Sequence, residues 1–176
     1  MKRTEPEMRL FDAIVAQDGT GNYTSVQAAI DAAPAGRVRP WLIFVKNGKY
    51  NEHINIPTTK PFLSIIGQDR DKTIILDDKL CGGENALHVS VGATVVVNAT
   101  DTYFENITLE NSYGHEKQAG PQALALNTTA DRAILNNVAL LSYQDTWITT
   151  STSNYRHYAK NCLIERSEEH TSELQS

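Results

Sequence analysis

The sequence is poor in the residues that usually cross-link small domains or hold metal ions. It has only two cysteines, Cys81 and Cys162, among 176 residues, which are too few for a disulfide framework and show no metal-ligand spacing. We interpret Cys162 as a small buried apolar residue and leave the state of Cys81 open. The histidines also share no metal-ligand spacing, so the sequence predicts no metal site.

Long apolar runs and an excess of positive charge are missing as well. No stretch approaches the roughly 20 apolar residues of a membrane helix, so no membrane span is predicted. Residues 1–6 lack the apolar core of a signal peptide, which suggests an intracellular protein or a chain that starts inside a longer one. The formal net charge of -5 argues against a nucleic-acid partner. With 40% hydrophobic residues, the composition is typical of one globular domain.

Local patterns change from helical to strand-like early in the chain. After a polar lead over residues 1–13, we expect a short strand at 14–16 and a helix at 24–33, which Thr24 or Ser25 can cap and Pro34 ends. The apolar residues of this helix share one face, so it needs an apolar surface to lie on. Short strands rich in branched residues are then predicted at 41–46, 62–67, 73–77, 86–90 and 94–97.

An internal repeat dominates the second half. Asn106, Asn137 and Asn161 each precede an alternating apolar segment and lie 31 and 24 positions apart. Such a period is typical of a solenoid whose coils stack about 4.8 Å apart. Ile107, Val138 and Cys162 would then form an interior column, and the three asparagines a hydrogen-bonded column at a bend. The alternative is an antiparallel sandwich with coincidental asparagines, but tight hairpin signals are missing between these segments.

Gln122, Gln144 and Asp145 form the candidate catalytic group. Gln122 and Gln144 lie 22 positions apart, close to one coil, so stacking would make them neighbours. Two side-chain amides can donate hydrogen bonds to an oxyanion, and an adjacent carboxylate can act as general acid or base. This set suits acyl transfer. The alternative is that all three are ordinary turn residues on a solvated edge.

Residues 14–165 resemble the pectin methylesterases (pectinesterases), which remove methyl groups from the galacturonate esters of plant cell-wall pectin. Five segments occur in the order of that family along nearly the whole chain. They are Asp18-Gly-Thr-Gly-Asn-Tyr-Thr-Ser-Val-Gln27, Gly48-Lys-Tyr50-Asn-Glu52, Thr102-Tyr-Phe-Glu-Asn-Ile-Thr-Leu-Glu-Asn111, Gln122-Ala-Leu-Ala-Leu126 and Tyr143-Gln-Asp-Thr146. Ser142 and Trp147 depart slightly from the commonest family forms, which we interpret as subfamily variation.

The resemblance implies an all-β fold, a right-handed parallel β-helix with a short N-terminal capping helix. It implies an ester hydrolase that needs no metal and no cofactor and acts on methyl-esterified pectin (homogalacturonan). It further implies an extracellular or periplasmic location and a full-length form that is a monomer. Ala93, Thr94, Tyr113 and Gln118 are candidates for lining a sugar groove.

Carried over by residue, the resemblance makes Gln122 and Gln144 the oxyanion donors. It makes Asp145 the acid that protonates the departing methanol and then the base that activates water. The family's nucleophile is a second Asp, in a Gly-x-Val-Asp-Phe-Ile segment that this sequence does not contain. Because no covalent ester intermediate can form without it, we expect this chain by itself to be inactive.

Residues 166–176 break the repeat after Glu165 and show no apolar alternation. We interpret them as a non-native tail on a truncated β-helix domain of residues 14–165, with a genuine disordered tail as the alternative. A coil left open after Glu165 would expose apolar interior and strand edges, so we expect aggregation or low stability. The rival functional hypothesis is a non-catalytic β-helix module that binds polysaccharide or packs in a larger assembly.

Overall fold

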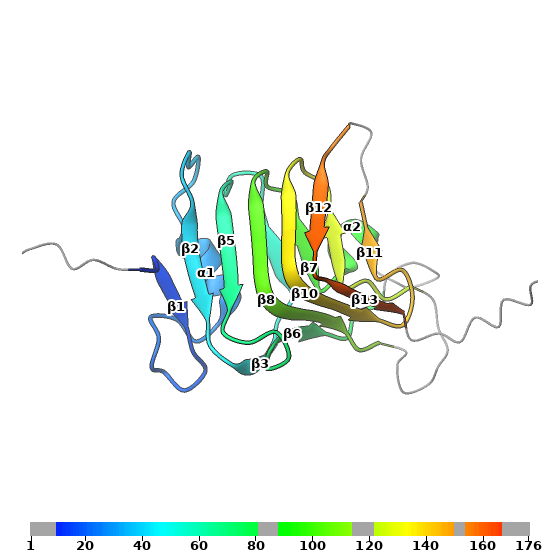
Figure 1. The fold of residues 1–176 in the computed structure, drawn as a ribbon, viewed down its shortest axis with the longest axis horizontal. Coiled ribbons are helices and arrows are strands. Elements are labelled where there is room, and N and C mark those ends of the chain that lie inside the picture. The colour runs from blue at the N-terminus through cyan, green and yellow to red at the C-terminus, as the bar shows by residue number, and fades with distance from the viewer. Residues whose placement is uncertain (1–9, 81–87, 114–121, 150–153, 167–176) are drawn as a thin grey trace, which may run out of the picture.

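The chain winds into a parallel β-helix (Figure 1). The computed structural model describes residues 10–80, 88–113, 122–149 and 154–166. Within these ranges every pair of named strands runs parallel. This pairing confirms the predicted solenoid and excludes the antiparallel sandwich.

Three faces enclose the core, and each coil contributes to them in turn. The first face holds β1 (Ala13–Val15), β2 (Trp41–Val45), β5 (Leu63–Gly67), the first parts of β8 (Thr102–Asn111) and β10 (Ala133–Ser142), and β12 (His157–Lys160). The second holds β3 (Gly48–Asn51), β6 (Thr73–Asp77), the later parts of β8 and β10, and β13 (Leu163–Arg166). The third is a separate sheet of β4 (Ile54–Ile56), β7 (Val95–Val97), β9 (Leu126–Thr128) and β11 (Trp147–Ile148).

A single left-handed asparagine makes the bend between the first two faces. Asn106, Asn137 and Asn161 have φ angles of 52°, 53° and 56°, a conformation that asparagine tolerates better than most residues. Asn137 Nδ2 donates to Asn106 Oδ1 at 2.8 Å. The predicted column was wrong in one respect: among the described residues no such bond joins the exposed Asn161 to Asn137.

Stacked apolar columns fill the interior because equivalent residues pair in register. On the first face the column runs through Ile43, Ile65, Phe104 and Leu135, all with no solvent exposure. Ile107 pairs with Val138, and Cys162 precedes the Leu163 that pairs with Ala139, so the predicted second column is present. Cys162 is half-buried against this core and is a free thiol.

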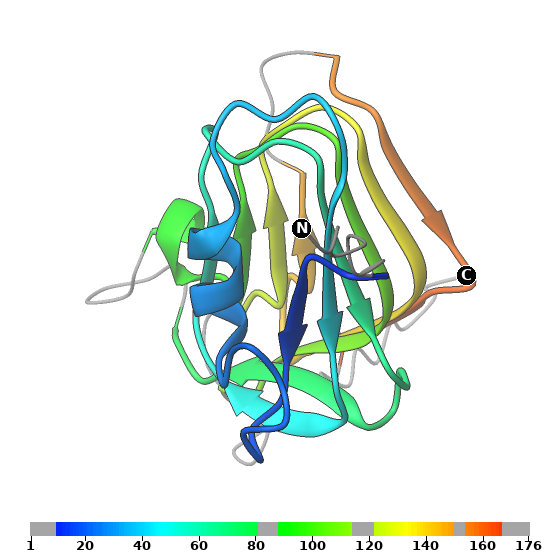
Figure 2. The ribbon, with the colours of Figure 1, turned by 90° about the vertical axis from the view of Figure 1, so that its left-hand side faces the viewer.

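Helix α1 (Val26–Ala32) covers the first coil, as predicted (Figure 2). It buries Val26, Ala29 and Ile30, and Ser25 Oγ accepts from Ala28 N at 3.2 Å as the N-cap. Glu52, which follows β3, adds a second cap because its two carboxylate oxygens accept from Val26 N and Gln27 N, each at 2.9 Å. The negative charge also suits the positive end of the helix dipole.

The strand predictions differ from the structure at the two-residue β11, which was not predicted, and in two further places. The strand expected at 86–90 was wrong where it can be checked, because residues 89 and 90 belong to a short helix, α2 (Val89–Gly92), while 86 and 87 lie outside the described residues. Strands β3 and β4 were not predicted. They are short, and polar residues such as Asn51 and Asn55 interrupt their apolar pattern.

The last coil is open along one edge. Strands β12 and β13 pair with β10 and, among the described residues, with no strand on their other side. Leu163 and Ile164 are accordingly exposed, Ile164 by 51%. Strand β13 extends to Arg166, one residue beyond the predicted domain limit at 165. No helix in the described ranges is long and apolar enough to cross a membrane.

Candidate active site

The three candidate residues lie on adjacent coils, at the corner that leads into the third face. Gln122 comes shortly before β9, and Gln144 with Asp145 comes directly before β11. These strands pair with Leu126 opposite Trp147. Ahead of the pairing, Ala123 N donates to Gln144 O at 3.1 Å. The backbone next to Gln122 therefore contacts Gln144, and all three candidates are half-buried.

The turn that presents Asp145 is tight and firmly held. Asp145 has a φ of 55°, and a left-handed conformation costs a non-glycine residue on the order of 1–3 kcal/mol unless its surroundings enforce it. Here Thr146 O accepts from both Ala125 N and Leu126 N at 3.1 Å. The preceding coil thus fixes the backbone of the residue after Asp145.

A side-chain link ties the same turn to the following coil. Ser142 Oγ donates to Thr146 Oγ1 at 2.8 Å, and Thr146 Oγ1 donates to Glu165 O at 3.1 Å. Both hydroxyl residues are nearly fully buried. Sequence reasoning missed this link; the two hydroxyl residues spaced four apart around Gln144 and Asp145 were a signal for the first bond only, because the bond to Glu165 depends on the register of the following coil.

Asn111, also missed from the sequence, holds the segment that follows Gln122. Its buried side chain donates from Nδ2 to Leu124 O at 3.0 Å and to Lys79 O at 2.9 Å. Its Oδ1 accepts from Tyr113 N at 3.1 Å. Through these bonds Asn111 joins two successive connections, because Lys79 follows β6, whereas Tyr113 and Leu124 both lie between β8 and β9.

The predicted groove lining was wrong for two of its four residues. Ala93 and Thr94 have no solvent exposure, and Thr94 Oγ1 donates to Glu110 O at 2.9 Å inside the fold. Tyr113 is half-buried, and Gln118 lies outside the described residues. Ala93 packs with Val96 and Leu124 in a small apolar cluster, which accounts for its burial.

Two histidines outside this corner, His53 and His157, contact other residues of the fold. His157 Nε2 lies 3.1 Å from Ala130 O, and since a carbonyl only accepts, this nitrogen carries the proton. Burial lowers the pKa of His53, and Lys79 nearby lowers it further. Asp77 lies 3.6 Å from His53 Nδ1 and raises this pKa, but the effects of burial and Lys79 outweigh it, so the pKa stays below its usual value. Within the described ranges no cluster of three or more His, Cys, Asp or Glu side chains could hold a metal ion.

Chemically, this corner combines two neutral amide donors with one carboxylate. Amide N–H groups held in place can stabilise negative charge that develops on a carbonyl oxygen. A carboxylate beside them can pass a proton to a leaving group and take one from water. The arrangement therefore suits hydrolysis of an ester, provided that a nucleophile joins it.

Comparison with known proteins identifies relatives along nearly the whole chain. The family model described as pectinesterase matches residues 12–167. A pectinesterase from Petunia integrifolia is 37% identical over 154 residues, which cover 87% of this chain and 39% of that protein. Pectin methylesterase from carrot superposes with a TM-score of 0.78 at 29% identity, over 91% of this chain and 48% of that chain.

A further solved structure shows a related protein with a bound saccharide. It is a pectin methylesterase variant in complex with a hexasaccharide, 27% identical to this chain with a TM-score of 0.75. The match covers 89% of this chain and 49% of that one. The chain thus spans between 39% and about half of the length of these three relatives.

Proposed function

This chain belongs to the pectinesterase family, and we propose that it carries part of the active site of an enzyme that hydrolyses the methyl esters of pectin. The contact from Ala123 N to Gln144 O supports this most directly. It brings the backbone beside Gln122 against Gln144 and Asp145, as a shared oxyanion and acid–base site requires.

Each residue has one role in the proposed reaction. A nucleophilic carboxylate attacks the ester carbonyl, and Gln122 and Gln144 donate hydrogen bonds to the oxyanion that forms. Asp145 gives its proton to the methoxy oxygen as the carbon–oxygen bond breaks and methanol leaves. The resulting carboxylate of Asp145 then takes a proton from water, which attacks the acyl-enzyme and releases the free uronate.

The nucleophile is the part that this chain does not supply. The Asp implied by the family resemblance belongs to a Gly-x-Val-Asp-Phe-Ile segment, which is missing from the sequence. The bond from Thr146 Oγ1 to Glu165 O fixes the Asp145 turn against the next coil, which contains Glu165. This contact supports a nucleophile one coil beyond Asp145. We therefore propose that the chain alone releases no methanol.

Methyl-esterified pectin is the proposed partner, in line with the hexasaccharide complex of the related enzyme. The extracellular or periplasmic location and the monomeric full-length form remain predictions from the family. A non-catalytic module that binds polysaccharide remains the alternative. It predicts pectin binding without methanol release, even when the missing coils are supplied.

A chimera tests the proposal. Residues 12–165 are joined, in coil register, to the remaining half of carrot pectin methylesterase, and methanol release from methylated pectin is measured. We expect activity in the chimera, a loss of about 10²–10⁴-fold in kcat for Asp145→Asn and of about 10²–10³-fold for Gln144→Ala. The matched control is Asp71→Asn, which changes an exposed carboxylate away from the corner.

Two results would contradict the assignment. Undiminished activity in the Asp145→Asn chimera would remove Asp145 from the mechanism. Methanol release by the unextended chain would show that the nucleophile is already present. Far-UV circular dichroism of each chimera verifies that the β-helix has formed before its kinetics are compared.

A further inference from the structure

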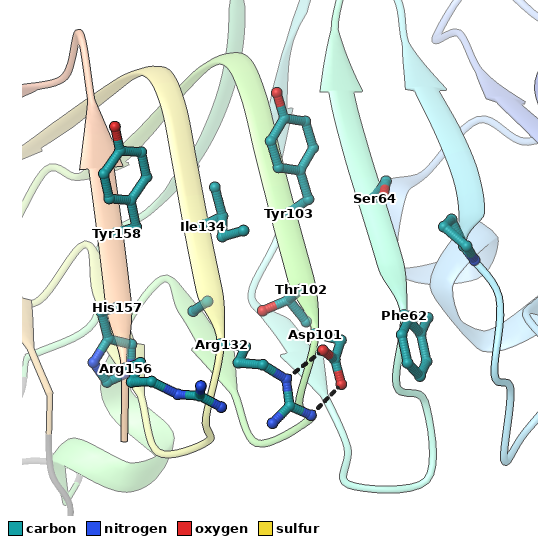
Figure 3. Close-up of a pocket in the computed structure, with 12 residues that line it drawn as sticks. Phe62, Ser64, Asp101, Thr102, Tyr103, Arg132, Ile134, Arg156, His157 and Tyr158 are labelled. Carbon is teal, nitrogen blue, oxygen red and sulfur yellow. Dashed lines mark hydrogen bonds and ion pairs between the residues drawn. The ribbon is translucent and has the colours of Figure 1, made fainter. Parts of the chain in front are cut away.

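A groove crosses the outer side of the first face, away from the candidate active site (Figure 3). Its volume is about 520 Å³, and it runs across β5, β8, β10 and β12. Gln122, Gln144 and Asp145 do not line it. Because it crosses successive coils, the groove follows the axis of the β-helix, the direction in which an extended polymer could lie.

A row of large side chains stands on the floor of this groove. Tyr103 pairs with Ile134, and Ile134 with Tyr158, so the three belong to one register position. In Figure 3 both tyrosines extend in the same direction with Ile134 between them. Ile134 is 39% and Tyr158 is 59% exposed. Neighbouring strands lie about 4.8 Å apart, which separates the two tyrosines by roughly 10 Å. Adjacent exposed apolar side chains often mark a binding surface.

The ring of Tyr103 is held before any ligand arrives. Asn136 Nδ2 lies 3.3 Å from the Tyr103 hydroxyl oxygen and donates to Glu105 Oε1 at 2.9 Å. These neighbours fix the polar end of the tyrosine and leave its ring toward the groove. A side chain that is already ordered loses little entropy on binding.

The charges along one edge of the groove neutralise one another. Arg132 donates from Nε and Nη2 to both carboxylate oxygens of Asp101, at 2.5 and 2.6 Å, and from Nη1 to Asp131 at 2.7 Å. Arg156 donates to Asp131 from Nη2 at 2.6 Å and from Nε at 3.1 Å. These bonds hold the pKa values of both carboxyl groups below their usual range. Asp131 does not line the groove itself but pairs with both arginines that do. All four groups stay ionised near neutral pH, and the charges of this network sum to zero.

We propose that this groove is a second saccharide site, which binds methyl-esterified galacturonan in preference to the de-esterified chain. The identity of the ligand rests on the proposed function, because the substrate of that reaction is a neutral polymer and its product is anionic. Sugar C–H faces and ester methyl groups can pack on Tyr103, Ile134 and Tyr158. A free carboxylate placed there would lose its hydration, which costs free energy. It would not regain that energy from an ion pair, because Arg132 and Arg156 are already paired with aspartates. The site would therefore hold the protein on stretches that are still methylated.

Binding to the full chain tests this directly. Titration calorimetry compares a fully methyl-esterified hexagalacturonate with its de-esterified form. We expect the esterified oligomer to bind at least about tenfold more tightly, and Tyr158→Ala to weaken its binding about tenfold. The matched control is Tyr155→Ala, because Tyr155 is also exposed, by 40%, but does not line the groove. It should leave the affinity unchanged.

A second variant tests the charge argument without depending on loss of binding. Ile134→Lys places a cation between the tyrosines at a partly exposed position, and we expect it to shift the preference toward the de-esterified oligomer. Thermal unfolding of each variant establishes that it is folded.

Two results of the titrations would overturn the proposal: no binding of the esterified oligomer, or equal binding of both oligomers. Loss of binding in Gln122→Ala with retention in Tyr158→Ala would also overturn it. So would self-association of the protein through the groove, if Tyr158→Ala abolishes that association. None of these outcomes affects the methanol release that is measured for the chimera. The proposal of a second saccharide site and the proposed esterase function can therefore fail separately.

Discussion

Replacing Asn137 separates the two contributions that the bend makes to stability. In Asn137→Gly the left-handed φ of 53° remains easy to adopt, but the 2.8 Å hydrogen bond to Asn106 is lost, together with the much longer 3.4 Å contact from Arg70 Nη1. A net cost of about 1 kcal/mol is expected for that bond. In Asn137→Ala the same bond is lost, and a side chain without local hydrogen bonding must adopt the left-handed conformation, which adds about 1–2 kcal/mol. The expected total for alanine is therefore about 2–3 kcal/mol.

Urea unfolding followed by far-UV circular dichroism at low protein concentration measures both free energies. In a separate thermal unfolding experiment, the alanine variant of a chain of this size should lose roughly 4–12 °C in Tm, at about 2–4 °C per kcal/mol. The control is Asn51→Ala, an exposed asparagine within β3, for which we expect a change below about 0.5 kcal/mol. Equal destabilisation by glycine and alanine would refute the cost assigned to the left-handed bend. No change in either would refute the contribution of the hydrogen bond.

Four other perturbations test separate parts of the molecule. Glu52→Ala removes the carboxylate that caps α1 and should lower the free energy of unfolding by about 1–2 kcal/mol, read from urea denaturation with Glu52→Gln as the partial replacement. Burial lowers the pKa of His53 in the folded state, so the stability that neutral His53 contributes is complete above its unfolded pKa of about 6.5 and declines as the pH falls below that value. His53→Gln should therefore reduce the loss of stability between pH 7.5 and pH 5, measured from unfolding curves at both values. Thr146→Val leaves Glu165 O without its hydroxyl donor and should lower kcat in the chimera more than it raises KM, whereas Thr146→Ser should restore activity; equal activity in both variants would contradict a positioning role. Ile164→Lys should reduce concentration-dependent self-association at the open edge, measured by sedimentation velocity, and an unchanged profile would show that association occurs elsewhere.

The features that sequence reasoning predicted depend on local chemistry or on stacking distance. The asparagine repeat identified the coils because a left-handed bend constrains the residue that makes it. The face of α1 followed from helical spacing alone. Gln122 and Gln144 were placed near each other because their separation is close to one coil, and the contact from Ala123 N to Gln144 O confirms that their coils are neighbours at this corner.

The features that sequence reasoning missed depend on contacts between one coil and the next. The bond from Thr146 to Glu165 O requires the register of the following coil, which the sequence around Thr146 does not encode. The groove was also missed, because a period of two assigns Tyr103 and Ile134 to an outer face without saying what lies over that face. Strand signals alone misassigned residues 89 and 90, where Val89 is β-branched but belongs to a helix.

The asparagine bend and the candidate active-site corner differ in how much variation in chain length they allow. One residue makes the bend in both β8 and β10, so the pairing between these strands continues through it without a change of register. Differences in coil length must then arise at other corners. The interval from β8 to β9, which contains Gln122, is indeed much longer than the interval from β10 to β11, which contains Asp145. Insertions at this corner can therefore reshape what surrounds the candidate residues, while the asparagine bend keeps the coils aligned and the fold intact.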